Sequence, residues 1–152
     1  TSTGFAALAV GMAQGVLQEW LTYTAPRKSR GIPVAEQPGT QVVAARASAE
    51  IDAAEALYLG TIRRAMVVLE AGGKLSEMDL MTSRRNVAFA CKLALKAGTR
   101  LFNAAGGRAL FRGNGIERQY RNLLGAVSHH GVAWDVAASG YGKMLLEEYA
   151  GR

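Results

Sequence analysis

The stretch TQVVAARASAEIDAAEALYLGTIRRAMVVLEA, residues 40–71, decides the fold class of this chain. Its apolar side chains recur in steps of three and four, which is the spacing of one face of an α-helix. Roughly 30 residues at a rise of 1.5 Å give a rod about 45 Å long. The many alanines allow neighbouring helices to approach closely, and Gly72-Gly73 can end the helix. The stripe consists of Val43, Ala47, Ile51, Ala54, Tyr58, Ile62, Ala65 and Leu69.

Helical spacing recurs in the rest of the chain. Ser76 and Asp79 have the spacing of a helix N-cap and an acidic residue three positions later, and Gly131 interrupts the pattern near the C-terminus. No alternating β-branched run indicates a strand, so the prolines and glycines around residues 26–39 predict an irregular loop. We therefore predict an all-α, antiparallel four-helix bundle whose last helix is broken near Gly131. The other helices are expected over about residues 5–23, 76–105, 116–128 and 134–149.

Composition limits the classes of function. The 152 residues fit one domain, 1–152, and the single cysteine, Cys91, excludes an internal disulfide and fits a cytoplasmic protein. Two adjacent histidines and no Glu-x-x-His pair give no expected metal site. No run reaches the roughly 20 apolar residues of a membrane span. The net charge is +6, but acidic residues separate the arginine pairs, so we expect no nucleic-acid binding.

Polar chemistry concentrates between residues 103 and 130. Backbone N–H groups and the guanidinium of Gly106-Gly107-Arg108 could cradle a phosphate, although a helix C-cap followed by a solvated arginine explains the same residues. His129 could move a proton at a reacting oxygen, or it could cap a short helix or make a buried hydrogen bond. Arg27 and Arg30 in the first loop could likewise bind a phosphate, or they could be solvated arginines without a ligand. Cys91 lies on an apolar face and is expected to pack in the core.

Two short segments resemble the C-terminal helical domain of the acyl-CoA dehydrogenase superfamily. Residues 23–31, YTAPRKSRG, resemble the family loop Tyr-x-x-x-Arg-x-x-Phe-Gly, in which the arginine contacts the flavin phosphate. Residues 103–107, NAAGG, resemble the Gln-x-x-Gly-Gly turn, which meets the flavin tail of a neighbouring subunit. Because Asn103 stands where glutamine is usual, reduced FMN is the expected flavin, with FAD as the alternative. The resemblance implies cofactor contacts by Arg27, Arg30, Gly106, Gly107 and Arg108.

A third segment indicates the branch of the superfamily. Residues 116–122, IERQYRN, followed by His129, resemble the pattern apolar-x-Arg-x-aromatic-Arg-Asp/Asn and then His of flavin-dependent monooxygenases. This resemblance implies that a C4a-hydroperoxyflavin oxygenates a small organic substrate. It also implies that His129 lies over the flavin and stabilises the hydroperoxide or protonates the departing oxygen. It also implies a homotetramer, FMNH2 from a separate flavin reductase, and a chain that is the C-terminal part of a longer flavoprotein. Residues 1–152 alone are expected to be inactive.

Two alternatives stay open. An acyl-CoA dehydrogenase-like oxidoreductase needs a carboxylate base, and Arg112 stands where we align that base; an arginine cannot accept the proton at physiological pH. A non-catalytic oligomerisation bundle would explain why residues resembling the N-terminal helical and β-domains of the family are not in this sequence.

Overall fold

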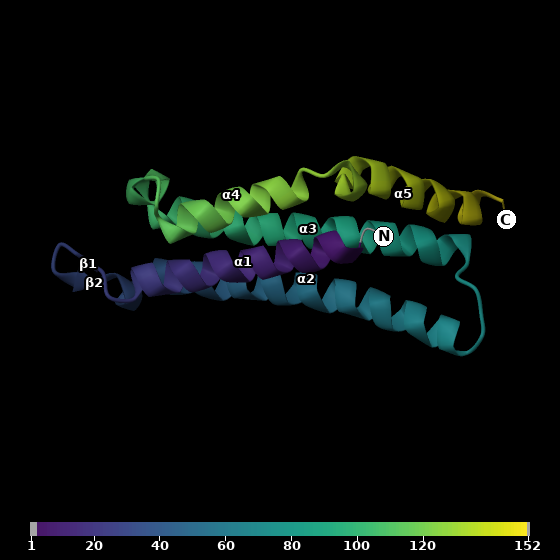
Figure 1. Cartoon of the computed structure of the whole chain (residues 1–152), viewed down its shortest axis with the longest axis horizontal. Helices are drawn as coiled ribbons and strands as arrows, with labels where there is room; N and C mark the ends of the chain where they lie inside the picture. The colour runs from purple at the N-terminus through teal and green to yellow at the C-terminus, as the bar shows by residue number, and fades with distance from the viewer. Residues whose placement is uncertain (1–2, 152) are drawn as a thin grey trace.

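The computed structural model of the chain describes residues 3–151; residues 1, 2 and 152 of the predicted domain lie outside the described part. Five α-helices account for most of it (Figure 1). Three 3-10 turns (η1–η3) and two two-residue strands connect them. In chain order the elements are α1 Thr3–Thr24, β1 Lys28–Ser29, β2 Ile32–Pro33, η1 Val34–Glu36, α2 Pro38–Glu70, α3 Glu77–Ala105, η2 Gly107–Leu110, α4 Gly115–Val127, η3 His130–Val132 and α5 Trp134–Ala150.

The two longest helices, α2 and α3, form an antiparallel hairpin on which the others lie. Helix α1 starts part-way along this hairpin and contacts α2, α3 and α4, whereas α5 packs against α3. Figure 1 shows α4 and α5 following one another along α3, with η3 between them. The all-α prediction and the break near Gly131 are thus confirmed. Four helices enclose a core only in the half that α1 and α4 cover.

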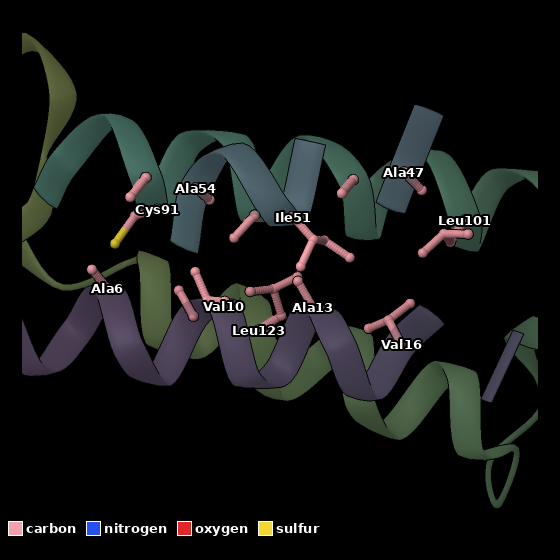
Figure 2. Packing of buried hydrophobic residues seen from close by; sticks show 14 of the residues in the cluster. Ala6, Val10, Ala13, Val16, Ala47, Ile51, Ala54, Cys91, Leu101 and Leu123 are labelled. Carbon is pink, nitrogen blue, oxygen red and sulfur yellow. The ribbon is translucent and has the colours of Figure 1, made fainter. Parts of the chain in front are cut away.

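Small side chains fill this core. Figure 2 shows residues of α1 pointing towards α2, α3 and α4, with Ile51 and Leu123 between the helices. Gly98 of α3 has no space for a Cβ atom because the Leu123 side chain of α4 occupies it. Burial raises the pKa of the Cys91 thiol to about 11, so this residue packs as predicted. Fully buried alanines of the core include Ala6, Ala9, Ala13, Ala47, Ala54, Ala90, Ala94 and Ala97.

Local signals set the ends of α3. The Ser76 hydroxyl accepts a hydrogen bond from the Asp79 N–H at 3.1 Å, and the Asp79 carboxylate accepts one from the Ser76 N–H at 3.1 Å. This is the reciprocal cap that the sequence predicts. At the other end Gly106 takes a φ of 77°, a left-handed backbone conformation that favours glycine and stops the helix.

The first loop is more regular than the sequence predicts. Lys28 and Ser29 pair antiparallel with Pro33 and Ile32 in a minimal hairpin. Its two central residues, Arg30 and Gly31, have φ values of 51° and 81°. A two-residue type I′ hairpin turn requires positive φ at both positions. Arginine rarely takes this conformation, so the usual Asn-Gly signal for such a turn is missing from the sequence.

Candidate functional site

His129 lies where the end of α4 meets the beginning of α1. Its Nδ1 accepts a hydrogen bond of 3.0 Å from the Gly131 N–H, so the side chain caps η3. Its ring stacks on Phe5 of α1, with the ring centroids 4.1 Å apart and the planes 23° from parallel. The imidazole is solvent-exposed at this junction.

Capping does not prevent a role in proton transfer. A neutral imidazole that accepts at Nδ1 carries its proton on Nε2, which is then a hydrogen-bond donor. The contacts with Gly131 and Phe5 fix the ring in place, and the exposed edge can meet a ligand. The capping alternative is therefore present, and it leaves Nε2–H available as a hydrogen-bond donor.

The motif of residues 116–122 on α4 contains a side chain that packs against α3 and others that are exposed. The Tyr120 hydroxyl lies 3.0 Å from Thr99 Oγ1, and its ring stacks on Phe102 with centroids 4.5 Å apart. Tyr120 thus fixes α4 to α3. Arg118 and Asn122 are exposed on the other side of the helix.

The predicted phosphate-binding residues lie at the other end of α4. Gly106 is the C-cap of α3, Gly107 begins η2, and Arg108 is exposed, so the capping interpretation of the turn is also realised. Figure 1 places this turn and the β1–β2 hairpin at the same end of the bundle. Since α4 has 13 residues, its length of about 20 Å separates this end from His129.

The end of the bundle that carries the β1–β2 hairpin has buried polar groups without a hydrogen-bond partner. The Arg27 guanidinium lies 4.5 Å from the centre of the Tyr23 ring. Within residues 3–151, three buried polar atoms on the last turns of α1 have no hydrogen-bond partner: Trp20 Nε1, Tyr23 Oη and Thr24 Oγ1. Buried polar atoms without partners are costly. The Arg27 guanidinium over the Tyr23 ring supplies the positive charge that a phosphate-bearing cofactor would need.

A cation-rich cluster joins α2 and α3 on their outer surface. Arg100 donates two hydrogen bonds to the Glu50 carboxylate, at 2.8 and 3.2 Å, and these bonds raise the pKa of Arg100. Lys96 and Arg46 approach the same carboxylate at 3.6 and 3.7 Å. Three cations around one carboxylate leave this surface positive. Within the described residues, no three or more His, Cys, Asp and Glu side chains are grouped so that they could hold a metal ion. None of the helices over residues 3–151 combines the length and hydropathy of a membrane-spanning segment.

Comparison with known families gives the identity of the fold. Residues 3–134 match the model of the family described as "Acyl-CoA dehydrogenase, C-terminal domain". The chain belongs to this family. The family predicted from the sequence is thereby confirmed.

Similar proteins include several flavin-dependent hydroxylases. The chain is 29% identical over 151 residues to the oxygenase component of an FADH2-dependent resorcinol hydroxylase from Rhizobium sp. (strain MTP-10005), covering 93% of this chain and 37% of the relative. A solved 3-HSA hydroxylase from Rhodococcus sp. RHA1 superposes with a TM-score of 0.88 at 25% identity, over 96% of this chain and 38% of that one.

More distant structures share the fold. The HsaA monooxygenase from M. tuberculosis matches with a TM-score of 0.84 at 23% identity, over 97% of this chain and 39% of the other. XiaF from Streptomyces sp., solved with FADH2 and glycerol, gives 0.89 at 19% identity, over 96% and 38%. The chain therefore spans less than two fifths of the length of these proteins.

The structure brings some predicted residues together and separates others. Gly106, Gly107 and Arg108 share one end of the bundle with Arg27 and Arg30, and His129 lies apart from all five. Phe5, the stacking partner of His129, was missed. It carries no local signal, because it belongs to the first helix and meets the histidine only after folding. The roles of all six predicted site residues stay predictions.

Proposed function

We propose that this chain is the C-terminal bundle of the oxygenase component of a two-component flavin monooxygenase, as part of a longer polypeptide. The similarity to the resorcinol hydroxylase oxygenase supports this assignment. Reduced flavin, when bound, activates O2 and supplies the oxygen atom that is transferred to a small organic substrate.

The fixed imidazole of His129 is the observation that carries the proposal. With Nδ1 held by the Gly131 N–H, Nε2 can donate a hydrogen bond to the oxygen that must leave as water or hydroxide. Phe5 covers one face of the ring and limits its rotation. The chain thus provides one oriented hydrogen-bond donor for that oxygen.

The hairpin and the Gly106-Gly107-Arg108 turn are proposed to hold the phosphate end of a flavin. Because about 20 Å of α4 separates them from His129, one copy would serve two flavins, each lying between subunits of a homotetramer. The dependence of the resorcinol hydroxylase on FADH2 favours reduced FAD over the FMNH2 expected from the sequence. A separate reductase would supply it in the cytoplasm.

The test is the coupling of flavin oxidation to product in the full-length enzyme. His129→Ala should lower the yield of oxygenated product per reduced flavin and increase H2O2 release by a similar amount. His129→Asn keeps a good helix cap without the imidazole and should show the same loss. His130→Ala is the matched control and should stay coupled. Unchanged coupling in His129→Asn would contradict the proposed role.

A second candidate, dehydrogenation of a thioester, is favoured by the family description alone. It predicts exchange of the α-proton of an acyl-CoA analogue with solvent by the full-length enzyme. Absence of exchange together with substrate-dependent oxygenation would reject this candidate.

A further inference from the structure

A groove of about 580 Å3 opens between α2 and α3 beyond the beginning of α1. In the enclosed half of the bundle α1 lies along this hairpin, but no helix of the described chain continues it past Thr3 (Figure 1). The volume is in the range of pockets that bind small molecules. Most of its wall is apolar, including Leu57, Ala65, Met66, Leu69, Leu75 and Leu80.

A hydrogen-bonded polar network forms part of the groove wall. Asn86 is 9% exposed, and its Oδ1 accepts from Arg85 Nε at 2.9 Å and Nη2 at 2.6 Å. Its Nδ2 donates to Thr61 Oγ1 at 2.9 Å, and that hydroxyl donates to the Leu57 carbonyl at 2.8 Å. Arg85, Asn86 and Thr61 all line the groove. The network satisfies the buried amide and fixes the position of the arginine.

The Arg85 guanidinium is held in a single orientation. It lies 4.1 Å from the centre of the Tyr141 ring of α5, so the ring covers one of its faces. Its Nη1 takes no part in the bonds to Asn86. A guanidinium fixed in this way retains N–H donors that suit a carboxylate.

The remaining charges of the groove cancel. Arg64 Nε lies 3.6 Å from the Asp79 carboxylate, and both residues line the groove. Arg85 therefore leaves one net positive charge beside an apolar wall. A neutral apolar ligand would leave this positive charge without a counter-ion, whereas an anion would neutralise it.

We propose that this groove binds an organic anion with an apolar body and a single carboxylate, with the carboxylate at Arg85. The site is distinct from the His129 junction. Thr3 lines the groove and Phe5 stacks on His129, and side chains two positions apart on a helix point about 200° apart. The ligand would thus lie on the opposite side of α1 from the imidazole. The proposal needs no flavin and does not depend on the proposed function.

Calorimetric titration of the flavin-free protein with 1-naphthoate and with the neutral analogue 1-naphthylmethanol tests the proposal. Arg85→Gln should weaken naphthoate binding about tenfold and leave the affinity for the alcohol unchanged. Arg84→Gln is the matched control because it removes an exposed charge from the adjacent residue, and it should bind both probes like the wild type. Equal weakening by Arg84→Gln, or no naphthoate binding by the wild type, would overturn the proposal.

A second variant keeps the test informative if Arg85→Gln loses its fold. Ala65→Phe places a ring inside the groove one helical turn from Thr61 without removing any member of the Arg85 network, and it should abolish binding of both probes. Circular dichroism confirms that each variant is folded. Naphthoate affinity that is the same in Ala65→Phe as in the wild type would place the anion elsewhere and reject the groove.

Discussion

The two halves of the α2–α3 hairpin differ in what lies against them. In the enclosed half, α1 and α4 cover the hairpin, and Ile51 is 2% exposed. At the open end α5 is the only described helix that lies alongside, and Leu69 of the same helical stripe is 54% exposed. The same two helices thus form a core in one half and a groove in the other. His129 and Phe5 lie at the boundary, where α1 begins and α4 ends.

Side-chain size follows this division. Alanines dominate the enclosed half, so the helices approach closely and each extra atom must displace a neighbour. Larger apolar residues such as Met66 and Leu80 line the open end, where space remains. The enclosed half should therefore be sensitive to mutation and the open end tolerant.

The largest difference should come from removing a large side chain in each half. Ile51→Ala leaves a cavity among buried residues and should lower the free energy of unfolding by about 2–5 kcal/mol. Leu146→Ala on α5, where the leucine is 73% exposed, should change it by no more than about 0.5 kcal/mol. Urea denaturation of the two variants measures both values. Similar losses would show that the open end is as closely packed as the core.

Two glycine substitutions should have opposite signs. Gly98→Ala places a methyl group against the buried Leu123 and should cost about 1–3 kcal/mol. Gly60→Ala adds the same methyl in α2 where nothing lies within 4 Å, so it should stabilise the protein by about 0.4–1 kcal/mol through helix propensity. Thermal unfolding of the two variants tests this. Destabilisation by Gly60→Ala would indicate that other atoms fill the space beside Gly60 in the groove.

The smallest effect concerns the cap at the start of α3. Ser76→Ala should lower the free energy of unfolding by about 1 kcal/mol at neutral pH. Hydrogen bonds from the Ser76 side chain, followed by its backbone N–H, hold the pKa of Asp79 below its usual value.

The effect of this cap should depend on pH. A carboxyl whose pKa is lower in the folded state stabilises the protein above its unfolded pKa, and this stabilisation is lost as the pH falls through the folded pKa. The difference between wild type and Ser76→Ala should therefore shrink in acid. Urea denaturation at pH 7 and pH 3 measures it, and a constant difference would show that Asp79 has no part in the cap.

Part of the fold and of the candidate site follows from local sequence. The reciprocal cap of Ser76 and Asp79 and the glycine at position 106 predicted the ends of α3, because a helix cap is made by residues within one turn of each other. Gly131 predicted the break before α5. The β1–β2 hairpin was missed because Arg30 stands at a position where glycine or asparagine usually signals the turn. His129 was predicted as a site residue from its residue type and motif, but the orientation of its ring could not be predicted.

By itself the sequence determined the helices, their ends and the family, since periodicity, caps and motifs belong to contiguous residues. The tertiary structure alone decided which part of the α2 stripe is buried, from Ala47 to Ala54, and which part lines a groove. It also decided that Phe5 meets His129 and that Tyr141 covers Arg85. The physical reason is that burial and ring contacts depend on where distant helices begin and end beside one another, which no local pattern records.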